Sequence, residues 1–440
     1  MSDFLSYNNL DAPNEKILME AVPRYNPIFA NTGPHRLRVA LYSHDTMGLG
    51  HIRRNLAIAE ALVSCQLRPI ILLLSGVREI CAFNLPACVD SIVLPALYKN
   101  GDGSYRSRYL DVTLNELRLM RETIITAALE TFVPDVLIVD KEPTGAIGEL
   151  RKPLEALRLH GHTRCVLGLR DVLDEPLAVQ KDWSLHNKHE VIRRYYDAVW
   201  VYGDASVYNL VQEYRLPHDV AAMTCYTGYL GRFQSDAIEK REENFLKSVG
   251  LKLERLVICT VGGGQDGERL AEAFMEIDLP PDTCGLLMTG PYMSSDTRQR
   301  LHTRISTRPS FRLIDFAPRP ISLLQQADCI ITMGGYNTIC EALSLGKRLL
   351  VVPRVSPRRE QLIRAERMQE LGLLDMLHPD AVTPEALNGW LRKRANHCSP
   401  VGKGIDLNGM KRLPGLLAEL LNAPSKLAID NSTRRRERVG

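Results

Sequence analysis

Short, unbroken apolar runs alternate along the chain with segments in which apolar residues recur at helical spacing. After the run RLRVALYSH (36–44), for example, Ile52, Leu56, Ala59 and Val63 follow the period of a helix. Further runs of the first half are RPIILLLS, DVLIVD, RCVLGLRDV and DAVWVYGD. Apolar strands without alternation, separated by helices, predict a parallel sheet that is covered on both faces.

This alternation stops in the polar, charged stretch before residue 251 and then starts again. The later runs are RLVICTVGGG, CGLLMTGP, FRLIDFAP, DCIITMGG and KRLLVVPR. The sequence therefore predicts two Rossmann-like α/β domains in tandem, at 37–230 and 251–424, joined by a linker at 231–250. The polar residues 1–36 are expected to form a surface or disordered extension, and 425–440 a basic tail.

Composition narrows the classes of protein that fit. The chain has 440 residues, 45% hydrophobic and 24% charged, which is typical of a soluble globular protein. A net charge of +3 gives no reason to expect a nucleic-acid partner. Ten cysteines without a CxxC pair, and a start without a basic and apolar leader, predict a cytoplasmic protein with free thiols. A peripheral contact with the inner face of the membrane is left open.

Three glycine-rich loops each follow a predicted strand and open a predicted helix: HDTMGLGH, VGGGQDG and MGGYNT. Ligands of such sheets sit at the carboxyl ends of the strands. A helix start presents unpaired N–H groups, which suit an anion such as phosphate. Thr338 and Glu341 also fit the capping box S/T-x-x-E, so Glu341 could serve its own helix end instead of a ligand.

The order and spacing of these motifs resemble the GT-B glycosyltransferases of the family-28-like group. That group includes the N-acetylglucosaminyltransferase of lipid-linked peptidoglycan precursor synthesis. The resemblance is carried by Gly48-Leu49-Gly50-His51, by Gly262-Gly263-Gly264-Gln265 and, most specifically, by the block at 327–373. It implies the GT-B fold, in which two Rossmann-like domains face each other across a cleft.

The resemblance also implies that a nucleotide sugar binds in this cleft, with a UDP-sugar as the expected donor. Glu341 would accept hydrogen bonds from the ribose, Phe316 would lie at the base, and Glu360 and Gln361 would contact sugar hydroxyls. The residues that would approach the diphosphate or sugar are Gly48, Gly50, Gly263, Gly264, Gln265, Gly334, Gly335, Asn337 and Thr338. The loop RVSPRRE departs from the family pattern, and its Arg354, Arg358 and Arg359 could pair with the diphosphate or remain solvated.

His51 is the predicted catalytic base, because it ends a glycine-rich turn at a helix start and an imidazole has a suitable pKa. Several strand-end carboxylates could orient its ring, and the sequence does not choose among Asp45, Asp140, Glu142, Asp171 and Asp174. The chain has no Asp-x-Asp pair, so neither a metal nor another cofactor is expected. Glu341 has no acidic residue eight positions away, which favours a single displacement with inversion.

Other functions remain open at this stage. The segment GLGHIRRN also resembles the G-x-G-H-x-x-R segment of nucleotide-sugar hydrolases with a GT-B-like fold, in which the histidine would activate water. A nucleotide-sugar 2-epimerase is a weaker relative, and a non-catalytic regulatory protein that binds a nucleotide sugar is a further alternative. The acceptor is unknown; a lipid-linked molecule or a precursor of the cell envelope or of a polysaccharide is among the candidates. Arg53 and Arg54 could hold an anionic acceptor or form a solvated helix face.

Overall fold

The computed structural model describes residues 36–46, 48–100, 102–231, 255–317, 320–393 and 404–424. The chain from Leu37 onward belongs to one compact unit. The expectations for the N-terminal extension, for most of the linker and for the basic tail fall outside the described residues. None of the described helices is long and apolar enough to cross a membrane.

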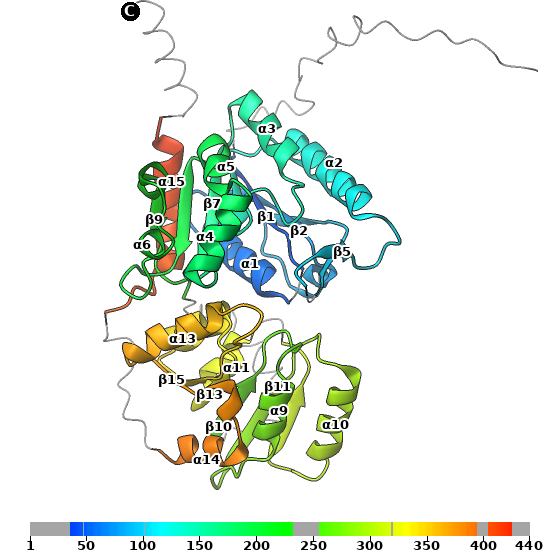
Figure 1. Ribbon diagram of the computed structural model, residues 1–440, viewed down its shortest axis with the longest axis vertical. Helices are drawn as coiled ribbons and strands as arrows, with labels where there is room; N and C mark the ends of the chain where they lie inside the picture. The colour runs from blue at the N-terminus through cyan, green and yellow to red at the C-terminus, as the bar shows by residue number, and fades with distance from the viewer. Residues whose placement is uncertain are drawn as a thin grey trace, which may run out of the picture. The chain divides into compact units, whose positions relative to one another are not determined.

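The first half of the chain forms a parallel sheet of seven strands in the order β3-β2-β1-β6-β7-β8-β9 (Figure 1). Its strands are β1 (Arg38–Ser43), β2 (Ile70–Ser75), β3 (Val89–Val93), β6 (Val136–Asp140), β7 (Arg164–Arg170), β8 (Ala198–Tyr202) and β9 (Thr224–Tyr226). Its helices are α1 (Gly50–Val63), α2 (Leu114–Phe132), α3 (Arg151–His160), α4 (Pro176–Leu185), α5 (Lys188–Tyr195), α6 (Leu210–Glu213) and α7 (His218–Ala222). A 3₁₀ helix, η1 (Arg78–Ala82), and an antiparallel pair, β4 (Leu97–Lys99) and β5 (Tyr105–Ser107), lie between β2 and α2 in the chain.

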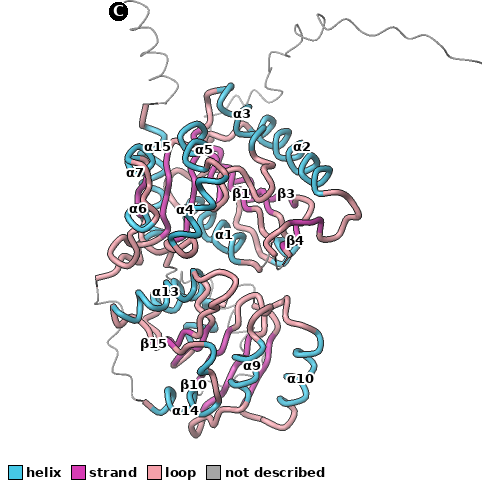
Figure 2. Tube along the Cα trace, viewed as in Figure 1, coloured by secondary structure: helices cyan, strands magenta, loops and turns pink. Residues whose placement is uncertain are grey.

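The second half forms a parallel sheet of six strands in the order β12-β11-β10-β13-β14-β15. Figure 2 draws its strands in magenta and labels β10 and β15. Its strands are β10 (Arg255–Thr260), β11 (Thr283–Met288), β12 (Phe311–Ile314), β13 (Cys329–Thr332), β14 (Arg348–Val351) and β15 (Asp375–Met376). Its helices are α9 (Glu268–Met275), α10 (Ser295–Ile305), α11 (Ile321–Gln326), α12 (Tyr336–Ser344), α13 (Glu360–Glu370), η2 (Pro379–Ala381) and α14 (Pro384–Arg392).

The unalternating apolar runs form the strands because both faces of each sheet are packed. All five residues of β6 are buried, as are the last five of β1 and of β10. The predicted two parallel α/β sheets are therefore confirmed. In each sheet the strand order reverses beside the first strand, at β1/β6 and at β10/β13. Those two positions are the switch points at which such sheets bind ligands.

The last helix, α15 (Gly409–Asn422), does not stay with the second sheet. It packs against α1, and Figure 1 draws it in red beside β9 of the first sheet. The segment before it is tied to the first half, because the backbone N–H of Tyr229 donates to the carbonyl of Asp406 over 2.8 Å. The range 251–424 predicted for the second domain thus includes a helix that packs against the first half.

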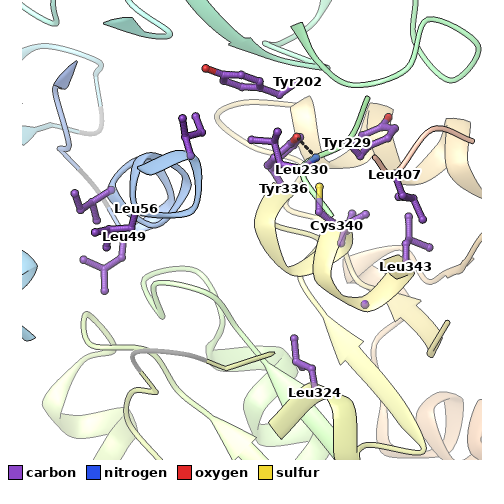
Figure 3. Close-up of a cluster of buried hydrophobic side chains, with 14 of the residues drawn as sticks. Leu49, Leu56, Tyr202, Tyr229, Leu230, Leu324, Tyr336, Cys340, Leu343 and Leu407 are labelled. Carbon is purple, nitrogen blue, oxygen red and sulfur yellow. Dashed lines mark hydrogen bonds between the residues drawn. The ribbon is translucent and has the colours of Figure 1, made fainter. Parts of the chain in front are cut away.

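One hydrophobic cluster contains residues of both halves. Leu49 and Leu56 of the α1 region and Tyr336, Cys340 and Leu343 of α12 belong to it (Figure 3). In the same cluster the backbone N–H of Leu230 donates to the hydroxyl of Tyr336 over 3.2 Å.

A buried ion pair joins the same two halves. The guanidinium of Arg364 on α13 donates to both carboxylate oxygens of Asp171, which follows β7, over 2.7 and 2.8 Å. Both side chains are only 1% exposed. Removal of one partner would leave the other as an uncompensated buried charge.

We therefore expect Arg364→Met to lower the free energy of unfolding by about 3–5 kcal/mol in urea titrations. The matched control is Arg367→Met on the same helix, because its ion pair with Glu213 is 44% and 32% exposed and should contribute about 1 kcal/mol or less. The double variant Asp171→Asn/Arg364→Met should recover part of the loss. Equal effects of the two single variants would show that the buried pair does not hold the halves together.

Candidate functional site

A cavity of about 250 Å³ lies where the three glycine-rich loops meet. These loops follow β1, β10 and β13, the central strands of the two sheets. Most of the predicted site residues line it: Gly48, Gly50, His51, Gly263, Gly264, Gln265, Phe316, Gly335, Asn337, Thr338, Glu360 and Gln361. Gly334, Glu341 and Arg358 do not line it.

The glycines allow close approach of the loops. Gly264 has φ +94°, and a Cβ there would lie 2.3 Å from the carbonyl oxygen of Thr289. A Cβ on Gly263 would stand 3.5 Å from the Cα of Gly48, so the loops of the two halves are near neighbours. Asn337 adds a direct link, because its side-chain amide donates to the carbonyl of Gly50 over 3.0 Å.

His51 is held by Asp140, which ends β6. Its Nδ1 lies 2.6 Å from one carboxylate oxygen of Asp140, and Arg54 donates to both oxygens of that carboxylate over 2.6 Å. An ionised carboxylate can only accept a hydrogen bond, so this contact assigns the proton to Nδ1. The unprotonated Nε2 is then the ring nitrogen available to a ligand.

The electrostatics of this group favour a neutral imidazole. Burial is the largest influence and lowers the pKa of His51; the Arg54 guanidinium also lowers it, whereas the Asp140 carboxylate opposes the shift. Burial would raise the pKa of Asp140, but Arg54 and His51 outweigh it and hold that pKa well below its usual range. The side chain of His51 is 15% exposed and that of Asp140 only 1%, so the base can meet a ligand while its partner cannot.

The other carboxylates considered for this role are engaged elsewhere. Asp45 accepts from the backbone N–H of Ile52 over 3.1 Å and so serves the start of α1. Asp171 is occupied by Arg364, and Glu142 accepts from Lys188 over 2.7 Å. Asp174 accepts from the backbone N–H of Arg359 over 2.9 Å. Asp140 is therefore the residue that orients His51.

The capping-box interpretation of Thr338 and Glu341 is wrong. Helix α12 begins at Tyr336 with Gly335 as its N-cap, and no side chain caps it. Glu341 consequently lies in the second turn, where it is 3% exposed. It accepts two hydrogen bonds from Nη2 of Arg53 over 2.9 and 3.0 Å, and this ion pair links α12 to α1.

Sequence reasoning missed part of the cationic lining. Arg170, at the end of β7, lines the cavity together with Arg53, Arg54 and Arg354. Nothing in the local sequence marks Arg170, because only the register of β7 brings it here. Arg358, by contrast, was predicted for this site but lines a different cavity.

Several buried polar atoms in this lining have no partner within the described part of the chain. They are Nε of Arg170, Nε of Arg354 and Oε2 of Glu360. Glu360 uses its other oxygen to accept from Arg354 over 2.6 Å. Burial raises the pKa of Glu360, but the guanidinium groups of Arg170 and Arg354 bring it down to about 2, so the group is ionised. Buried donors and acceptors that lack partners are a sign of a polar ligand.

Comparison with known proteins adds to this geometry. Residues 257–398 match the model of the glycosyltransferase family 28 C-terminal domain. A relative from Shouchella clausii (strain KSM-K16) is the UDP-N-acetylglucosamine–N-acetylmuramyl-(pentapeptide) pyrophosphoryl-undecaprenol N-acetylglucosamine transferase. It is 28% identical over 137 residues, which are 30% of this chain and 37% of the relative. The alignment thus spans well under half of that relative's length.

Two solved structures share the whole fold. MurG from Acinetobacter baumannii has a TM-score of 0.52 at 17% identity, over 87% of this chain and 99% of that chain. The UDP-GlcNAc 2-epimerase from Methanocaldococcus jannaschii has a TM-score of 0.55 at 14% identity, over 88% of this chain and 100% of that chain. The predicted GT-B fold and the family-28-like resemblance are confirmed.

The geometry around His51 predicts a signed response to mutation. In a ¹⁵N-edited NMR titration, the His51 ring should titrate below its usual pKa of about 6.5. Asp140→Asn removes the carboxylate that raises this pKa and leaves Arg54 in place, so the pKa should fall further. His51→Gln identifies the signal, and a melting curve checks the fold of Asp140→Asn. A higher pKa in that variant would contradict the assigned ion pair.

Proposed function

We propose that this family-28-like GT-B glycosyltransferase transfers a sugar from a nucleoside diphosphate donor, with a UDP-sugar expected, to an acceptor hydroxyl. The observation that carries the proposal is that His51, held by Asp140, lines the same cavity as the glycine-rich loops at Gly263 and Gly335. A single displacement requires both a base and a group of donors that bind the departing diphosphate.

In the proposed step, Nε2 of His51 takes the proton of the acceptor hydroxyl as its oxygen attacks the anomeric carbon. The bond between that carbon and the diphosphate oxygen breaks, and the diphosphate leaves with the electron pair. The new bond forms on the face opposite the departing group, so the configuration inverts. The proton remains on His51, where Asp140 stabilises the imidazolium over 2.6 Å until it passes to water.

The departing diphosphate needs positive charge. The first turn of α12 and the backbone at 262–263 line the cavity and offer N–H groups. Arg170 and Arg354 add guanidinium groups whose Nε atoms are buried without a partner in the described residues. A diphosphate would satisfy these donors and offset the repulsion between the two cations.

The remaining lining suits the other parts of a nucleotide sugar. Phe316 packs edge-on to Phe83 at a centroid distance of 5.8 Å and presents an apolar wall for a base. The free oxygen of Glu360 and the side chain of Gln361 could accept from and donate to sugar hydroxyls. The relative's name specifies a UDP-sugar and a pyrophosphoryl-undecaprenol acceptor, so a lipid-linked acceptor, met at the inner face of a membrane, is the first to test.

We expect His51→Ala to keep donor affinity while turnover falls by about 10²–10⁴-fold, the usual contribution of a general base. The reason is that His51 belongs to the acceptor side, whereas the phosphate wall belongs mainly to the second half. UDP binding by calorimetry and turnover with acceptor present measure the two effects separately. Unchanged turnover would place the base elsewhere.

Product analysis of the wild type separates transfer from hydrolysis. A transferase should form glycoside when acceptor is supplied and release free sugar only slowly without it. Release of free sugar at full rate in water alone would instead identify a hydrolase that uses the same His51 site.

A second variant tests Glu341, which does not line the cavity but accepts from Arg53, which does. If it binds ribose hydroxyls, Glu341→Gln should weaken UDP binding by about ten- to hundredfold, because a charge-assisted hydrogen bond contributes about 1.5–3 kcal/mol. Arg53→Ala removes the only partner described for Glu341. Because Arg53 also lines the cavity, this variant is compared by its melting curve alone, which measures what the ion pair contributes to stability. A lower melting temperature with unchanged affinity would mean that Glu341 only joins α12 to α1.

A further inference from the structure

A second cavity, of about 650 Å³, lies in the first half of the molecule. Its walls come from the β4–β5 pair, from the glycine-rich loop after β6, from α4 and from Arg358 of the second half. It is larger than the cavity at His51. The proposed donor site uses none of its lining residues, although Arg358 belongs to the same loop as Arg354, which lines the first cavity.

Cations outnumber carboxylates in this cavity. Five cationic side chains line it, namely Lys99, Lys141, Arg151, Lys188 and Arg358, against the three carboxylates Glu142, Asp174 and Asp182. Lys188 alone bonds two of those carboxylates, Glu142 over 2.7 Å and Asp182 over 2.8 Å. The third carboxylate, Asp174, lies 4.0 Å from the guanidinium of Arg358. Because five cations face three carboxylates, the positive charge is only partly balanced by the side chains that line the cavity.

Lys141 is the most constrained of them. It follows Asp140 directly and adopts a left-handed backbone conformation, with φ +69°, that side chains rarely take. Its side chain is 9% exposed, and its carboxylate neighbour Glu142 is 3.8 Å away, beyond hydrogen-bond distance. Burial lowers the pKa of Lys141 well below its usual value, and the Arg358 guanidinium lowers it further.

Lys99 completes a cluster with Arg358 and Lys141. Burial lowers the pKa of Lys99, and the charge of Arg358 acts in the same direction. The charge of Arg358 disfavours the charged form of both lysines, so the three groups are costly to keep together unless an anion enters. Backbone strain and mutual repulsion at one cavity are more easily explained by a ligand than by stability.

Two chain segments connect this cavity to the catalytic one. At the end of β6, Asp140 holds His51 while the next residue, Lys141, lines the second cavity. In the loop before α13, Arg358 lines the second cavity while Glu360 lines the first. A molecule bound in the second cavity would therefore lie beside the strand end that carries Asp140, the partner of His51.

We propose that this second cavity binds an anionic group of the acceptor, a phosphate or a carboxylate, and so positions its hydroxyl for His51. The proposal rests on the proposed function for its catalytic meaning, but the binding itself does not depend on it. Ile147, Val179 and Trp183 form an apolar part of the wall. The part of the acceptor that binds here would thus carry an anionic group with an apolar group next to it.

Calorimetry with pyrophosphate and, separately, with malonate tests the proposal and distinguishes the two kinds of anion. The variant is Lys99→Gln/Arg358→Gln, and its melting curve is checked beside that of the wild type. Lys181→Gln is the matched control, because this exposed lysine lies on α4 but does not line the cavity. We expect the double variant to bind the preferred anion about tenfold more weakly or worse, and the control to bind it like the wild type.

Saturating UDP separates the two cavities. Anion binding that survives UDP and is lost in the double variant supports the second site. The proposal would be overturned if UDP abolished anion binding while the double variant retained it. It would also be overturned if neither pyrophosphate nor malonate bound to the wild type. If UDP itself does not bind while the double variant still loses the anion, the proposed donor fails and the anion site stands.

If the double variant melts early, Arg358→Gln alone replaces it, because this residue lies in a loop and is 31% exposed. The same outcomes then apply to the single variant, with a smaller expected loss, about threefold or more.

Discussion

The carboxylate of Asp140 determines the geometry of the proposed catalytic centre. It is buried at the end of β6, where desolvation would favour its neutral form, yet Arg54 and His51 keep it charged. Because Arg54 satisfies both oxygens, the carboxylate cannot rotate away from the imidazole. One buried charge therefore fixes the proton on Nδ1, the orientation of the ring and the nitrogen that faces the cavity. Lys141 directly follows Asp140 at the end of β6, and this position brings it to the second cavity.

A second constraint is that the catalytic cavity has walls from both halves, so its shape depends on the contacts between them. Tyr336 has a central place in these contacts. The centroid of its ring lies 5.7 Å from the guanidinium of Arg54 and 5.7 Å from that of Arg364, and its hydroxyl accepts from the backbone N–H of Leu230. Tyr336 directly follows Gly335, so the glycine-rich loop that would contact the donor includes the residue that joins the halves. Donor binding and the packing of the two halves are linked through it.

What the sequence predicted correctly is local in origin. The two parallel sheets follow from short apolar runs, and the three loops follow from glycines at strand ends. Each of these signals occupies only a few consecutive residues of the sequence. The prediction failed where partners are distant in sequence. Glu341 fits a capping box by spacing, but its partner Arg53 is 288 residues away. Arg170 carries no local signal, because only the fold brings it to the cavity. Among five candidate carboxylates, only the three-dimensional structure selects Asp140.

The distribution of positive charge adds a final argument. Four arginines line the first cavity, and a separate group of lysines with Arg358 lines the second. A nucleoside diphosphate needs only one such cluster, and the overall charge of +3 shows that the excess is local rather than general. An anion in either cavity would reduce the repulsion between the two groups of cations. The strand end at 140–142 serves both cavities, because Asp140 holds His51 and Lys141 and Glu142 line the second cavity, so this segment is where the charges of the two cavities would interact.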